Sequence, residues 1–156
     1  MIGRFALVLH SHLPWLKGHG RWPVGEEWLN QAIASSYVPV FDVLRRLAER
    51  GGRNLVTVGI TPVLAAQLDD PQCLADARGW VADWLWRTQE LALHDPAGAR
   101  REARAARHTL AALEGRYRAG FSPALRDLAD AGVVELLSGP ASHPFQPLLD
   151  ERAAAF

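Results

Sequence analysis

Two histidines near the start of the sequence, His10 and His12, are the first side chains whose type and spacing suggest chemistry. They follow an apolar run at 5–9, which is typical of a buried strand in a parallel sheet. Because side chains alternate along an extended chain, residues two apart point the same way. Ligands bind at the carboxyl ends of parallel strands, so these imidazoles are candidates to bind a metal or hydroxyl groups. The alternative is one buried, satisfied histidine and one exposed histidine.

Glu135 is a further candidate, because it lies within the apolar run 133–137. A carboxylate buried there is costly unless it is paired or hydrogen-bonded. Polar side chains that point into a barrel near the end of a strand are site candidates, whereas the alternative is an exposed glutamate on an edge strand. His143 follows in the next loop, at the same end of the sheet. We therefore expect Glu135 and His143 to join His10 and His12 in space.

Trp22 and Trp28 lie in or beside a long segment, 10–27, that glycine and proline residues mark as a loop. Long loops inside compact domains are usually functional. An indole ring can stack on the apolar face of a sugar, and the nearby carboxylates of Glu26 and Glu27 can accept hydrogen bonds from its hydroxyl groups. The alternative is simple packing of the loop.

The remaining sequence alternates between apolar runs and segments with helical periodicity. We predict strands over 5–9, 55–60 and 133–137, and helices over 28–50, 63–68, 71–93, 95–117 and 122–132. Pro39 predicts a kink or a two-part helix, Thr61 and Pro62 predict a helix start, and His108 and Tyr117 belong to a thin apolar face. The alternation indicates an α/β fold with a parallel sheet. Three strands cannot close a barrel, so the sheet is either small and open or part of something larger.

Composition and charge argue against several classes of protein. The 156 residues suit one domain with a real core, and the formal net charge of zero gives no electrostatic basis for binding nucleic acid or an acidic membrane. Cys73 is the only cysteine, which excludes an intramolecular disulfide, argues against a cysteine-based metal cluster and fits a reducing cytoplasm. The N-terminal apolar run is too short to span a membrane and lacks the features of a signal peptide. We therefore expect a cytoplasmic protein with no nucleic-acid or membrane partner.

Three of these segments together resemble glycoside hydrolase family 57, and most of all its α-glucan branching enzymes. They are the His-Ser-His-Leu-Pro-Trp motif at 10–15, the glutamate-bearing strand at 133–137 and the stretch 142–149. Segments within 22–29 and 61–64 are similar to the same subgroup. The resemblance covers residues 1–156 and implies an α/β fold that forms the N-terminal portion of a (β/α)7 barrel, with parallel strands and an inserted helical segment.

The resemblance also implies a reaction on α-1,4-glucans. A branching enzyme cuts an α-1,4 link and reattaches the chain as an α-1,6 branch, with water as a minor competing acceptor. The family uses a retaining mechanism, in which a glutamate nucleophile and an aspartate acid/base lie about 5 Å apart across the bond that is cleaved. Both residues come after Leu149 in the family pattern, so no catalytic residue carries over and we expect this chain alone to be inactive. No cofactor and no metal is implied.

The substrate-binding residues that the resemblance implies form a set of six: His10, His12, Glu135, His143, Trp22 and Trp28. The first four map to positions that contact the sugar or support the catalytic carboxylates, and the two tryptophans are weaker candidates. Two other interpretations stay open. One is a fragment of a metal-dependent hydrolase of the amidohydrolase type, with the His-x-His pair as zinc ligands, and the other is a non-catalytic glucan-binding remnant. A partial barrel would also expose unpaired sheet edges, which promote self-association.

Overall fold

The computed structural model describes residues 3, 5–137 and 139–154. Its elements follow one another along the chain as β1 (Val8–Ser11), α1 (Glu26–Ala32), the π-helical turn η1 (Ile33–Tyr37), α2 (Val38–Glu49), β2 (Val56–Ile60), α3 (Pro62–Leu68), α4 (Pro71–Leu91), α5 (Pro96–Glu114), α6 (Ser122–Asp130), β3 (Val134–Leu137), the 3-10 turn η2 (Gln146–Leu148) and α7 (Glu151–Ala154). None of the helices in these described ranges is long and apolar enough to cross a lipid bilayer.

The three strands form one parallel sheet in the order β1-β2-β3. The register places His10 opposite Gly59, and Gly59 opposite Leu137. Thr57, which precedes Gly59 by two residues, lies opposite Glu135. Because side chains two apart along a strand share a face, His10 and Glu135 are on the same side of the sheet.

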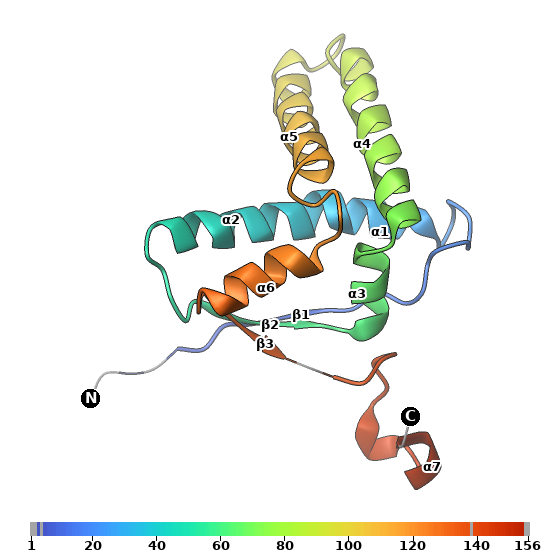
Figure 1. Cartoon of the computed structure of the whole chain (residues 1–156). Coiled ribbons are helices and arrows are strands. Elements are labelled where there is room, and N and C mark those ends of the chain that lie inside the picture. Colours follow the sequence, from blue (N-terminus) through green and yellow to red (C-terminus); the bar gives the residue numbers. More distant parts are fainter. Residues whose placement is uncertain (1–2, 4, 138, 155–156) are drawn as a thin grey trace.

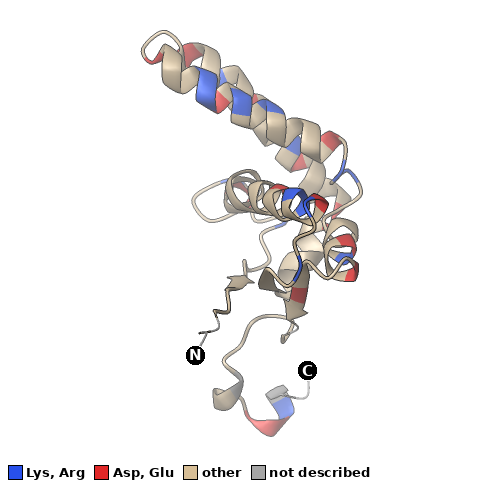
Figure 2. Ribbon diagram, turned by 90° about the vertical axis from the view of Figure 1, so that its left-hand side faces the viewer, with Lys and Arg blue, Asp and Glu red and all other residues tan. Residues whose placement is uncertain are grey.

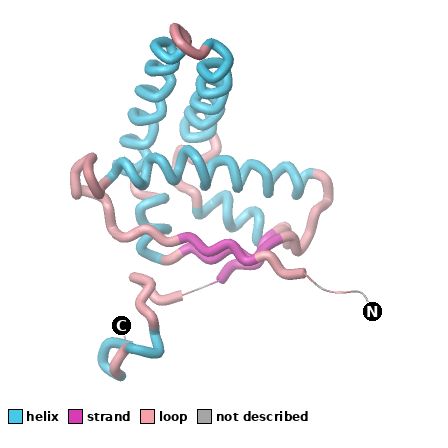
Figure 3. Tube along the Cα trace, turned by 180° about the vertical axis from the view of Figure 1, so that it is seen from behind, coloured by secondary structure: helices cyan, strands magenta, loops and turns pink. Residues whose placement is uncertain are grey.

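The two faces of the sheet have different surroundings. The main helices lie on one side, where the long helix of α1, η1 and α2 runs alongside the strands (Figures 1 and 3). Val56, Val58 and Val134 are buried on this side, and α6 packs against α2 and β3. Among the described residues no helical layer covers the opposite side, beyond which the C-terminal segment with η2 and α7 lies (Figure 1). The face that carries Glu135 is therefore open.

The first strand differs from its predicted position. The apolar run at 5–9 predicts a strand there, but Phe5 and Leu7 are exposed and pairing with β2 gives a strand only over Val8–Ser11. An apolar run indicates burial, but a strand also needs a neighbouring strand to hydrogen-bond to. That neighbour is β2, whose pairing with this segment starts where the amide of Thr57 donates to the carbonyl of Leu7. His10 consequently lies on the strand and not in the loop beyond it.

The predicted two-part helix over 28–50 is present, with a π-helical turn as its joint. It begins earlier than predicted, at Glu26. The amide of Val38 donates to the carbonyl of Ile33, five residues back, and Pro39 follows immediately. Proline has no amide hydrogen to continue the regular hydrogen-bond ladder, so the irregular turn lies where that ladder is interrupted.

Helices α4 and α5 form an antiparallel arm that projects away from the sheet (Figures 1 and 2). The buried face of α5 is made of small residues such as Ala99, Ala103 and Ala106, which allow the two helices to approach closely. The predicted apolar face was wrong at His108, whose side chain is 57% exposed. Tyr117 is buried as predicted but lies beyond the end of α5. Arginines give the exposed side of the arm a basic stripe (Figure 2).

A polar cluster joins the base of this arm to α2. Asp42 is buried in α2, and its carboxylate accepts a hydrogen bond from the hydroxyl of Tyr117 at 3.2 Å. The other carboxylate oxygen lies 2.5 Å from Nε2 of His108. The ring of Tyr117 stacks on Phe121 with a centroid separation of 4.4 Å. Burial and the charge of Asp42 raise the pKa of Tyr117, so its hydroxyl stays protonated and donates.

Candidate functional site

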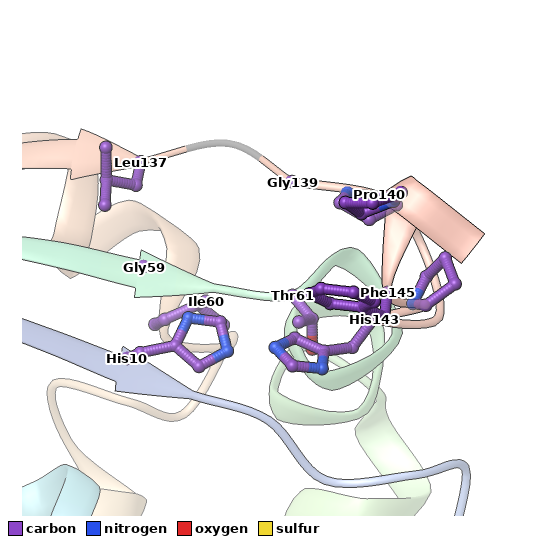
Figure 4. Close-up of a pocket in the computed structure, with 11 residues that line it drawn as sticks. His10, Gly59, Ile60, Thr61, Leu137, Gly139, Pro140, His143 and Phe145 are labelled. Carbon is purple, nitrogen blue, oxygen red and sulfur yellow. The ribbon is translucent and has the colours of Figure 1, made fainter. Parts of the chain in front are cut away.

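A cavity of about 440 Å³ opens at the carboxyl ends of the three strands. Its walls come from the end of β1, the end of β2 and the segment that follows β3, and they include His10, Thr61, Leu137, His143 and Phe145 (Figure 4). This is the edge where parallel α/β proteins bind their ligands. The open cavity therefore lies where the sequence placed the candidate site.

Two imidazoles, those of His10 and His143, line this cavity, and the imidazole of His12 packs against His143 beside it. The ring of His143 lies 4.6 Å from that of His10 and 4.7 Å from that of His12, measured between ring centroids, and it stacks on the latter. Burial lowers the pKa of His12, and the neighbouring His143 and His10 lower it further. A neutral imidazole carries one N–H donor and one nitrogen acceptor, so it can both donate to and accept from a hydroxyl group.

Thr61 holds the ring of His12, a role that the sequence did not reveal. Its hydroxyl oxygen lies 3.0 Å from Nδ1 of His12. Thr61 does precede the first residue of α3, as predicted, but its side chain makes no capping hydrogen bond to the helix. The pattern Thr-Pro is a common helix start, which concealed the contact with a residue 49 positions away.

Gly59 makes room for His10. A Cβ atom at this position would lie 3.1 Å from Nδ1 of His10 and 3.6 Å from Cβ of Leu137, which is tighter than ordinary contact for the imidazole. A glycine inside a strand often marks a close approach by another group. That signal was present in the apolar run 55–60, although the sequence alone does not say which group approaches.

Glu135 lies on the open face of the sheet, where it accepts a hydrogen bond of 3.0 Å from the hydroxyl of Thr57. It is exposed and belongs to an edge strand, so the expected burial of this carboxylate is not observed. It shares the face of His10 but does not line the cavity. The structure thus brings the three histidines together and leaves Glu135 beside them.

Trp22 and Trp28 lie away from the cavity walls. Trp22 is 79% exposed and Trp28 is 43% exposed. The carboxylates expected to accompany them have structural partners: Glu26 accepts from the amide of Gly18, and Glu27 accepts from the indole of Trp80 at 2.8 Å. In this structure the loop carries its aromatic side chains outward, and its acidic residues hold the loop and α1 in place.

The metal-dependent interpretation gains no support from the geometry. In the part of the chain that the structure describes, no group of three or more His, Cys, Asp or Glu side chains is arranged to hold a metal ion. His12 has Thr61 against its Nδ1, and His143 stacks face to face with it.

A parallel sheet with helices on one face, and with polar side chains gathered at its carboxyl ends, is the construction of an α/β-barrel enzyme. The sequence profile of glycosyl hydrolase family 57 matches residues 6–155, so the chain belongs to this family. The probable 1,4-alpha-glucan branching enzyme Rv3031 of Mycobacterium tuberculosis is 48% identical over 172 residues, which cover 99% of this chain and 33% of that protein. The 1,4-alpha-glucan branching enzyme TK1436 of Thermococcus kodakarensis is 30% identical over 155 residues, which cover 96% of this chain and 22% of that protein.

Solved structures agree with this assignment. A GH57-type branching enzyme from Pyrococcus horikoshii superposes with a TM-score of 0.86 at 30% identity, over 94% of this chain and 28% of that one. The Thermococcus kodakarensis enzyme, solved in complex with glucose and additives, also gives 0.86, at 29% identity, over 94% and 27% of the two chains. The predicted fold class, the N-terminal portion of a (β/α)7 barrel with an inserted helical segment, is confirmed. The chain spans about a third of the length of the curated relatives it matches most extensively.

Proposed function

We propose that residues 1–156 form the N-terminal part of the catalytic barrel of a 1,4-α-glucan branching enzyme, which cleaves an α-1,4 link in a glycogen-type glucan and rejoins the chain as an α-1,6 branch. One observation carries the proposal. Three imidazoles cluster at the carboxyl ends of the strands, with His10 and His143 lining the cavity and His12 stacked on His143, in a chain that is similar to branching enzymes along nearly its whole length.

In this proposal the histidines bind the sugar. His10, His12 and His143 contact glucose hydroxyl groups through their ring nitrogens. Glu135 lies on the same face of the sheet, two residues before Leu137, the β3 residue in register with His10 through Gly59. Its carboxylate adds a hydrogen-bond acceptor to that face. Trp22 and Trp28 contribute a stacking surface to a more distant part of the glucan, since both are exposed.

The chemical step needs groups beyond these. A retaining enzyme places a nucleophilic carboxylate and an acid/base carboxyl about 5 Å apart across the scissile bond. The described cavity walls contain no carboxylate, so we propose that the remainder of a barrel supplies both and that this chain alone does not branch glucan. In the described sheet β1 and β3 are the edge strands, so further barrel strands would join there and curve round the open face. In their absence the same edges favour self-association.

A chimera tests this proposal. Residues 6–155 replace the matching region of the Thermococcus kodakarensis enzyme, and branching is followed by iodine staining and branch-linkage analysis. We expect the chimera to branch amylose and the 156-residue chain not to. His12→Ala should lower the activity of the chimera, whereas His94→Ala, an exposed histidine between α4 and α5, should not.

Two outcomes would contradict the proposal. The first is robust branching by the isolated chain, and the second is a folded chimera whose activity is unaffected by His12→Ala. A folded chimera that binds maltooligosaccharides without branching them would favour the glucan-binding remnant. Zinc bound in stoichiometric amount to the purified chain would favour the metal-dependent interpretation.

A further inference from the structure

Gln67 is a completely buried polar side chain in α3, with a relative exposure of 0%. Its carbonyl oxygen accepts from the amide of Leu16 at 2.6 Å and from the amide of Lys17 at 3.3 Å. Its amide nitrogen donates to the carbonyl of Pro14 at 2.9 Å and to that of Val63 at 3.2 Å. Both ends of the side chain are therefore satisfied, as a buried amide requires.

Three of these four hydrogen bonds go to one short segment, 14–17, which begins two residues after His12. This segment has no helix or strand of its own. The carbonyl of Leu16 accepts from the amide of His19, whereas the amides of Leu16 and Lys17 and the carbonyl of Pro14 bond to Gln67. Leu16 is buried within it at 1% exposure. Gln67 thus fixes the position of the backbone of 14–17, which follows His12 in the chain.

Helix α3 also holds the ring itself. Thr61, the residue before the first turn of α3, bonds to Nδ1 of His12, and Gln67 lies near the other end of the same helix. His12 and its following segment are therefore attached to one rigid element at two separate points. The result is the stacked arrangement of His12 on His143.

We propose that Gln67 is a positioning residue, which acts through the backbone of 14–17 to hold the His12 imidazole in place against His143, a residue of the cavity wall. Its importance for glucan binding rests on the proposed function. Its effect on the His12 ring does not, because that effect can be measured in the absence of sugar.

The test compares two variants in the full 156-residue chain. Gln67→Leu removes all four hydrogen bonds at nearly the same volume, and Leu68→Ala destabilises the same helix through a buried apolar residue while keeping the hydrogen bonds of Gln67 to segment 14–17. NMR signals of the histidine rings are followed as the pH is changed. We expect Gln67→Leu to shift the ring signals of His12 and to raise its pKa toward the ordinary histidine value, because the ring loses its burial and its contact with His143.

Leu68→Ala should leave the His12 signals and pKa as in the original chain. Hydrogen exchange gives a second readout, since the Leu16 amide should lose its protection in Gln67→Leu and keep it in Leu68→Ala. Unchanged His12 signals in a folded Gln67→Leu protein would overturn the proposal. Equal shifts in both variants would reduce Gln67 to a general contributor to stability, which also overturns it.

If Gln67→Leu does not fold, Gln67→Met carries the same readouts, because methionine has the unbranched shape of glutamine, adds no buried charge and makes none of the four hydrogen bonds. The His12 shift should then have the same direction, and an unchanged ring would refute the proposal. Titration with maltooligosaccharide separates the two levels of the argument: a His12 ring that responds to Gln67 but not to sugar would leave the positioning role intact and contradict the proposed function.

Discussion

The cluster of Asp42, Tyr117 and His108 should hold the α4–α5 arm to α2, and replacing Asp42 by leucine tests this. The Tyr117 hydroxyl is buried, at 1% exposure for the residue, and Asp42 accepts its hydrogen bond. Without an acceptor, a buried hydroxyl costs about 1–3 kcal/mol. The pair with His108 adds at most about 1 kcal/mol, because the histidine is mostly exposed and solvent screens the interaction.

We therefore expect Asp42→Leu to lower the free energy of unfolding by about 1–3 kcal/mol, with the lost hydrogen bond of Tyr117 as the main cause. Asp42→Asn is the matched control, because it keeps an oxygen acceptor for Tyr117 and removes only the charge. Its loss should stay below about 1 kcal/mol. Urea denaturation followed by circular dichroism measures both values.

A double-mutant cycle isolates the hydrogen bond. In a Tyr117→Phe background, Asp42→Leu should cost less than it does in the original chain, because the hydroxyl that it would leave unsatisfied is already gone. Equal costs in the two backgrounds would refute this account of the cluster. A loss for Asp42→Asn as large as that for Asp42→Leu would instead show that the charge pair with His108 dominates.

Three further predictions follow from individual contacts. The pKa of His12 is lowered in the folded chain, so near and below the ordinary histidine value of about 6.5 the folded chain binds fewer protons than the unfolded chain. The free energy of unfolding should therefore fall as the pH drops through that value. An NMR titration that gives His12 a pKa at or above the ordinary value would contradict this prediction. Burial raises the pKa of the Cys73 thiol to about 11, so a thiol reagent should react with it only after unfolding, and fast labelling of the folded chain would show the assignment to be wrong. Gly25→Ala should destabilise the chain by about 1–3 kcal/mol, because the new Cβ would meet the carbonyl oxygen of Gly20 at 1.9 Å. Gly79→Ala, where nothing lies within 4 Å in the helix α4, should stabilise it by about 0.5–1 kcal/mol; urea denaturation compares the two, and equal effects would be inconsistent with the structure.

Much of the fold could be predicted because local chemistry determines it. Pro62, Pro71 and Pro96 each stand at the start of a helix, where the missing amide hydrogen costs nothing and the fixed backbone angle fits the first turn. The apolar runs at 55–60 and 133–137 lie within one residue of the observed strands β2 and β3. The run at 5–9 was less reliable, because its pairing depends on where a distant strand lies beside it.

The site residues also divide into those that the sequence could predict and those that it could not. His10, His12 and His143 could be expected to meet because parallel strands bring their carboxyl ends together, and the structure places their rings in contact. Thr61 and Gln67 could not be found from the sequence, since each contacts residues about fifty positions away and each fits a routine place in a helix. The outward position of Trp22 depends on the path of a loop that contains few apolar anchors.

The central claim is that the three clustered histidines bind glucan, and the chain contains its own control for the test. It has six histidines: three in the cluster at and beside the cavity, and three, His19, His94 and His108, elsewhere. The ring signals of all six can be followed by NMR during a titration with maltooligosaccharides. The account predicts that the signals of His10, His12 and His143 shift together and saturate while the other three stay unchanged; it would be contradicted if the three clustered histidines do not respond, or if all six shift alike.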